Sequence, residues 1–154
     1  MRRQSLKCIR TFLISIALGA VLSTIPATSA LAIDTYAESQ CSSGGFTGYF
    51  RVHYSYSPGS GSMTVRYYSY RINKGGNSGG NKANISVQDT GIMPARNYNL
   101  WDAGIQDNAY HVHSNPADYG RASNSYFNFR FTFDKSLTWP DPSCAGSFKP
   151  PSTF

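Results

Sequence analysis

Two of the three histidines lie in the stretch AYHVHSN, where His111 and His113 alternate with Tyr110 and Val112. If Tyr110 and Val112 face the core of a β-strand, both imidazoles face outward, about 7 Å apart and close enough to share one ion. His53 falls on the polar face of another predicted strand. Three imidazoles with one open coordination position make up a catalytic zinc site. The sequence therefore offers a zinc site at His53, His111 and His113, provided that the two strands are neighbours.

The simpler interpretation is that these histidines are ordinary polar residues of a sheet face. A metal site must satisfy ligand number, distances and geometry together, and the order of the strands does not follow from the sequence. Asp102 or Asp118 could supply a fourth ligand. We favour the simpler interpretation and expect no cofactor, with zinc as the alternative.

Aromatic residues form the second candidate site. In the stretch RYYSYR, Tyr68 and Tyr70 fall on one face of a strand and Tyr67 on the other, so some of these rings are expected at the surface. Exposed Tyr and Trp side chains can stack on sugar rings or anchor a partner. Tyr is also simply common in half-buried sheets. The sequence predicts that Tyr67, Tyr68, Tyr70 and Trp101 bind a polysaccharide or another component of the cell envelope.

Patterns of catalytic residues are sparse. Residues 33–154 hold a single glutamate, Glu38, whereas a glycosidase needs two carboxyl groups that face one sugar. The glycine-rich stretch 73–81 lacks the Lys-Ser/Thr pair and the helix that a phosphate-binding loop requires. We therefore expect a binding protein rather than an enzyme. A secreted effector or inhibitor, with a protein partner at loops 73–81 or 114–125, is a further alternative.

Residues 1–32 have the organisation of a secretory signal peptide. Four Lys and Arg residues precede an apolar run at 12–22, and the sequence ALA ends at Ala32. A run of eleven residues is too short for a membrane-spanning helix, which needs about 20. We predict cleavage before Ile33, an extracellular location, and a single domain at 33–154 without a transmembrane segment.

The predicted cleavage also changes the net charge. Residues 1–32 hold four of the 14 Lys and Arg residues and none of the eight Asp and Glu residues, so the mature chain carries about +2. Its remaining Lys and Arg residues are scattered along the sequence. A nucleic-acid-binding protein would gather such residues into a basic patch. We expect no nucleic acid among the partners.

Two cysteines, Cys41 and Cys144, remain after cleavage. An oxidising compartment favours a disulfide bond between them, and no C-x-x-C spacing points to redox chemistry. This bond would tie the start of the domain to its C-terminal tail. We expect the tail FKPPSTF (148–154), beyond Cys144, to be loosely ordered.

The elements that position these residues are predicted to be β-strands. In 126–134, Phe127, Phe129, Phe131 and Phe133 alternate with polar residues, the pattern of a half-buried strand. Short alternating segments separated by turns indicate a single antiparallel β-sandwich of about six to eight strands. We expect 73–81 to be a long hairpin loop. The predicted strands are 46–56, 63–72, 82–89, 98–103, 109–113 and 126–134.

Overall fold

The computed structural model describes residues 32–93, 95, 97–135 and 140–151. The predicted signal peptide, apart from Ala32, lies outside the described residues. Among the residues that the structure describes, no helix is long and apolar enough to span a membrane.

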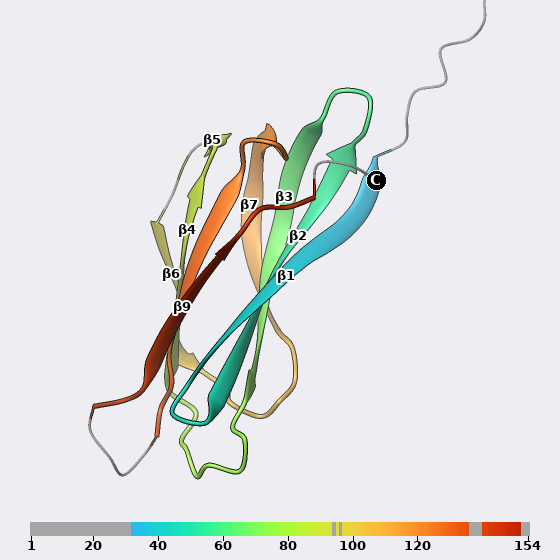
Figure 1. Cartoon of the computed structure of the whole chain (residues 1–154). Coiled ribbons are helices and arrows are strands. Elements are labelled where there is room, and N and C mark those ends of the chain that lie inside the picture. Colours follow the sequence, from blue (N-terminus) through green and yellow to red (C-terminus); the bar gives the residue numbers. More distant parts are fainter. Residues whose placement is uncertain (1–31, 94, 96, 136–139, 152–154) are drawn as a thin grey trace, which may run out of the picture.

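The described chain forms two antiparallel β-sheets that pack face to face, which confirms the predicted β-sandwich (Figure 1). One sheet has the order β1-β2-β3-β7-β5 and the other the order β6-β4-β8-β9. The strands are β1 (Ile33–Ser43), β2 (Phe46–Ser57), β3 (Ser62–Asn73), β4 (Ala83–Thr90), β5 (Ile92–Met93), β6 (Asn97–Gly104), β7 (His111–Arg121), β8 (Tyr126–Thr132) and β9 (Ser143–Phe148).

All six predicted strands are present, and three more join them, so the described residues form nine strands rather than the expected six to eight. Strand β1 is long, but its inward side chains are small and give little apolar alternation, as in Ala37 and Cys41. Strand β9 has the sequence SCAGSF, without a β-branched residue, and it pairs with β8 throughout. The expectation of a loosely ordered tail at 148–154 is therefore wrong for Phe148, which is the last residue of this strand. Partners in the sheet, rather than local propensity, form these strands.

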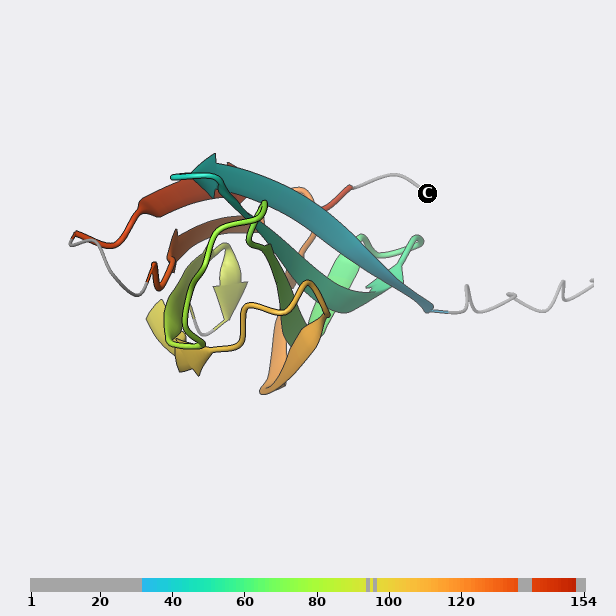
Figure 2. The ribbon, with the colours of Figure 1, turned by 90° about the horizontal axis from the view of Figure 1, so that it is seen from below.

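The core consists mainly of stacked aromatic rings that join the two sheets. Phe129 of β8 stacks on Phe50 of β2, with ring centroids 5.4 Å apart. Phe133, just after β8, stacks on Phe46 of β2 at 5.1 Å. The four phenylalanines of the 126–134 segment are all buried, as their alternation predicted. Figure 2 shows the two curved layers that enclose this core.

The loop between β3 and β4 passes from one sheet to the other, so the predicted hairpin at 73–81 is wrong. Hydrogen bonds fix this crossing to neighbouring segments. The side-chain amide of Gln106 donates to the carbonyl oxygens of Gly80 at 2.7 Å and Asp134 at 2.9 Å. The side-chain amide of Asn77 donates to the carbonyl oxygen of Gly44 at 3.2 Å.

The predicted loop 114–125 is also wrong, because β7 continues through residue 121. Pro116 lies within this strand, although proline removes a ladder donor. A bulge accommodates it: Ser114 pairs with Tyr67 and Asp118 with Val65, so three residues of β7 lie opposite Arg66 alone. The side chains of 115–118 lie outside the description.

The disulfide Cys41–Cys144 is present, as predicted. It joins β1, the edge strand of the first sheet, to β9, the edge strand of the second. These two strands lie side by side in Figures 1 and 2. The bond therefore closes one side of the sandwich.

We expect the disulfide to contribute strongly to stability. The cysteines are 103 residues apart, and loop-closure entropy for such a spacing amounts to about 4–5 kcal/mol. The double variant C41A/C144A should lower the free energy of unfolding by about that amount in urea denaturation. A loss under about 1 kcal/mol would contradict a closing role for this bond.

Candidate functional site

The three histidines of the predicted zinc site lie on opposite faces of the five-stranded sheet. His53 of β2 pairs with Tyr67 of β3, and its ring lies on the outer face with that tyrosine. His111 and His113 of β7 pair with Tyr70 and Tyr68, which are buried. Strand β3 also separates β2 from β7. The convergence of His53, His111 and His113, which the alternative of a zinc site required, is therefore wrong.

The orientation predicted for 109–113 is inverted. Val112 is 60% exposed, and Tyr110 contacts the outer face of the sheet through the Arg51 guanidinium. The ring of His113 instead packs edge-on against Trp101, with centroids 5.2 Å apart. The two imidazoles face the partly open side of the core, where aromatic rings cover them. Valine gave no reliable guide here, because an isolated apolar side chain is common at a protein surface.

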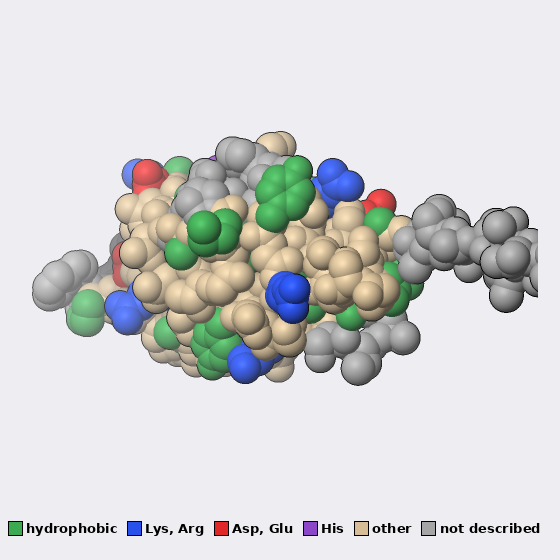
Figure 3. Space-filling model, turned by 90° about the horizontal axis from the view of Figure 1, so that it is seen from above, with side chains coloured by type: hydrophobic (Ala, Val, Ile, Leu, Met, Phe, Trp, Pro, Cys, Tyr) green, Lys and Arg blue, Asp and Glu red, His purple; other side chains and the backbone are tan. Residues whose placement is uncertain are grey.

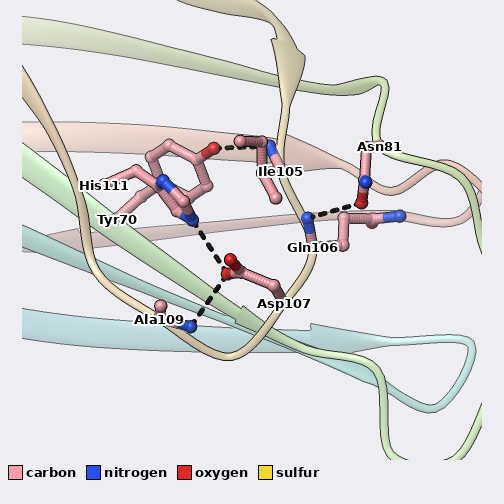
Figure 4. Close-up of polar contacts among 7 residues, drawn as sticks. All are labelled: Tyr70, Asn81, Ile105, Gln106, Asp107, Ala109 and His111. Atoms are coloured by element: carbon pink, nitrogen blue, oxygen red, sulfur yellow. Dashed lines mark hydrogen bonds and ion pairs between the residues drawn. The ribbon is translucent and has the colours of Figure 1, made fainter.

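His111 takes part in a small polar cluster at the end of the sandwich (Figure 4). Its Nε2 lies 2.8 Å from Oδ1 of Asp107, which also accepts the backbone N–H of Ala109 at 2.9 Å. The hydrogen bond to His111, followed by that to Ala109, lowers the pKa of Asp107. Nearby, the hydroxyl of Tyr70 accepts the N–H of Ile105 at 2.6 Å. These bonds fix the turn before β7.

Asn81 fixes the other side of the same turn, since its Oδ1 accepts the backbone N–H of Gln106 at 3.1 Å (Figure 4). Within the described parts of the chain, no three His, Cys, Asp or Glu residues are grouped so that they could hold a metal ion.

Two of the predicted sugar-binding tyrosines are buried. Tyr68 and Tyr70 are 0% and 1% exposed, because β3 is the central strand and this face of it packs on the other sheet. Their predicted exposure is wrong. Trp101 is half-buried, with its ring edge-on to Tyr70 at 4.5 Å. Tyr67, on the opposite face, is 36% exposed and is the member of the predicted set that reaches solvent freely.

Tyr67 belongs to a row of rings on the outer face of β1, β2 and β3. His53 stacks on Tyr67 at 4.1 Å, and Tyr36 lies beyond it, 5.5 Å from His53. Tyr36 is 49% exposed. The rings border a hollow of about 260 Å³, here called the tyrosine hollow. It is lined by Asp34, Thr35, Tyr36, His53, Tyr54, Arg66 and Tyr67.

Polar groups are fixed in and beside this hollow. Ser55 donates from its hydroxyl to Oδ1 of Asp34 at 2.5 Å, and Nε of Arg66 donates to the Ser55 hydroxyl at 2.8 Å. Nε2 of His53 lies 3.0 Å from the hydroxyl of Ser69. The hollow thus combines exposed rings with one carboxylate and one guanidinium that share a hydroxyl.

A neighbouring cluster holds Tyr36 in place. The guanidinium of Arg51 lies between Tyr36, 4.4 Å from its ring centroid, and Tyr110, at 3.7 Å. Nε of Arg51 is 2.6 Å from Oε2 of Glu38, which also accepts the Tyr110 hydroxyl. Cation–π contacts and the ion pair therefore order these side chains on the face of the sheet.

The row continues across the sheet through Arg71, which lies 5.1 Å from the Tyr110 ring and 4.0 Å from the Tyr49 ring. Burial, followed by the hydrogen bond to Glu38, raises the pKa of Tyr110 to about 12. Tyr110 therefore keeps its proton and remains a donor at any physiological pH.

Sequence reasoning missed Tyr36, Asp34 and Arg66. The first two lie on β1, whose outward residues are mixed in polarity and do not identify a strand. Arg66 lies at the bulge between β3 and β7, where strict alternation fails. In the sequence, the pattern RYYSYR indicated this site only through Tyr67, the exposed tyrosine of that stretch.

Residues 76–80 read Gly-Asn-Ser-Gly-Gly, which fits the G-x-S-x-G pattern of serine hydrolases. That chemistry needs a sharp turn from a strand into a helix. Here the pattern lies in the crossing loop between β3 and β4. The match carries no catalytic assignment.

Comparison with protein-family models, with curated proteins and with solved structures finds no match to this chain. The candidate site therefore stands on its own geometry.

The position of His53 predicts a pH dependence of stability. Burial and the nearby Arg51 guanidinium lower the pKa of His53 from its usual value of 6.5. As pH falls below 6.5, the unfolded chain binds a proton that the folded chain resists, so the free energy of unfolding falls. Between about pH 7.5 and 5.5, wild type should therefore lose more stability than H53Q. Equal losses would contradict this environment for His53.

Proposed function

We propose that this protein is an extracellular, non-enzymatic module that binds polysaccharide at the tyrosine hollow. The observation that carries the proposal is the pair of exposed rings, Tyr36 and Tyr67, on either side of the His53 ring. Such rings present flat apolar area with a polar tip, which suits the C–H faces and hydroxyls of sugars.

Polar side chains complete the recognition. Asp34 accepts hydrogen bonds and Arg66 donates them, so sugar hydroxyls can meet both kinds of partner in one hollow. The Ser55 hydroxyl between them limits their movement. Ordering before binding reduces the entropy that binding must overcome.

The size and openness of the hollow favour a short segment of a longer chain. At about 260 Å³, it lies just below the range of about 300–1,000 Å³ that encloses a drug-sized ligand. We expect weak binding at each site and stronger retention on an insoluble polymer, where many sites engage together.

Binding rather than hydrolysis is favoured by the charged groups. Asp34 is the carboxylate that lines the hollow. Glycoside hydrolysis uses two carboxyl groups on either side of the scissile bond. The ion pair of Glu38 with Arg51 and its hydrogen bond from Tyr110 commit that carboxylate to the neighbouring cluster.

The test is retention of the mature chain on insoluble polysaccharides, including cellulose, chitin, xylan and bacterial cell wall. We expect retention on at least one of them, and a loss of about thirtyfold in Y36A/Y67A, because each of the two stacked rings contributes about 1 kcal/mol. Y119A is the matched control, since Tyr119 is 63% exposed and lies outside the hollow.

Retention that survives Y36A/Y67A would remove the hollow from the proposal. Failure to bind any polysaccharide, together with recovery of one specific extracellular protein that Y36A/Y67A no longer binds, would replace polysaccharide by a protein partner.

A further inference from the structure

The outer face of the four-stranded sheet contains a groove of about 670 Å³. All four strands contribute to it, and we call it the amide groove. Its main polar side chains are Gln88 of β4, Asn97 and Asn99 of β6, and Asn128 and Arg130 of β8. The tyrosine hollow lies on the outer face of the other sheet, so the two sites are on opposite sides of the sandwich.

Small residues keep the groove open. Ser86 lies opposite Arg130 in the register, and Ala145 of β9 lies opposite Arg130 on the other side. Neither covers the guanidinium, which remains exposed. The groove is therefore kept open by the small side chains of Ser86 on β4 and Ala145 on β9.

The polar side chains of the groove are available to a ligand. Within the described part of the chain, the side chains of Gln88, Asn97, Asn99, Asn128 and Arg130 make no hydrogen bond or ion pair with other residues. Each carboxamide offers a carbonyl acceptor and two N–H donors. A chain of hydroxyl groups, each of which both donates and accepts, matches this combination.

The charge of the groove narrows the ligand. Among the lining residues, Arg130 is the single charged side chain, and no Asp or Glu is present. A guanidinium binds a carboxylate through two parallel hydrogen bonds. The groove therefore attracts an anionic group through Arg130 and contains no carboxylate that would repel it. A cationic ligand would be repelled by Arg130 and would find no carboxylate to bind.

We propose that the amide groove is a binding site for an acidic polysaccharide. A uronate carboxylate binds Arg130, and the hydroxyl groups of the flanking sugar rings bind the carboxamides. The volume of the groove lies within the range of enclosed ligand sites, about 300–1,000 Å³. This site does not depend on the tyrosine hollow, because it shares no residue with it.

The test is a titration of the mature chain with a defined oligogalacturonate. Binding is measured by calorimetry and by changes in the amide chemical shifts. The fully methyl-esterified oligomer is the matched neutral ligand. We expect wild type to bind the acid at least tenfold more tightly than the ester, and R130Q to lose that preference, because hydrogen bonds to charged groups are the stronger ones.

Two variants separate the contributions. N99A/N128A should weaken binding of the acid and the ester alike, by about tenfold, because it removes contacts to hydroxyl groups. R121Q is the charge-matched control, since Arg121 is exposed on β7 outside the groove, and it should bind like wild type. Y36A/Y67A should also keep its affinity for oligogalacturonate, which separates this site from the tyrosine hollow.

Several results would overturn the proposal. These are no binding of oligogalacturonate, equal binding of acid and ester, or equal losses in R130Q and R121Q, which would indicate general attraction to positive charge. Amide shifts confined to β1, β2 and β3 would place the acid on the other face.

Discussion

Stacking of phenylalanine rings between β2 and the β8 segment is the contact on which the rest of the molecule depends. Phe50 and Phe46 of β2 lie against Phe129 and Phe133, with centroids 5.4 Å and 5.1 Å apart. Burial of each ring contributes on the order of 2–3 kcal/mol. Because side chains alternate along a strand, fixing these rings inward also fixes which neighbours point outward. The inner register thus determines the chemistry of both outer faces.

The two outer faces differ in chemistry. The five-stranded sheet exposes rings and paired charges, as in the Arg51 guanidinium between Tyr36 and Tyr110. The four-stranded sheet exposes carboxamides and Arg130. Neither is a basic patch, and Figure 3 shows Lys and Arg side chains spaced apart over the end of the molecule. The two proposed sites therefore differ: the tyrosine hollow offers flat aromatic rings, and the amide groove offers carboxamides and one guanidinium.

The sequence predicted well wherever one face of a strand is strongly apolar. The alternating phenylalanines of 126–134 indicated the sandwich, and the disulfide expected for a predicted exported chain indicated its closure. Prediction failed where neighbouring strands determine which side chains are buried. Tyr68 and Tyr70 are buried because β3 is central, and strand order is a tertiary property. The orientation of 109–113 was predicted wrongly because Val112 faces solvent. Tyr36 was missed because β1 is formed by pairing with β2 and by the disulfide of Cys41, and not by a pattern in its own sequence.

The division of tyrosines between core and outer face is the central claim, and mild nitration of the folded protein followed by peptide mapping tests it most directly. Tyr36, Tyr67 and Tyr119 should react quickly, because they are 49%, 36% and 63% exposed. Tyr68 and Tyr70 should react only after unfolding. Rapid nitration of Tyr68 or Tyr70 in the folded protein, or protection of Tyr36 and Tyr67, would contradict the account.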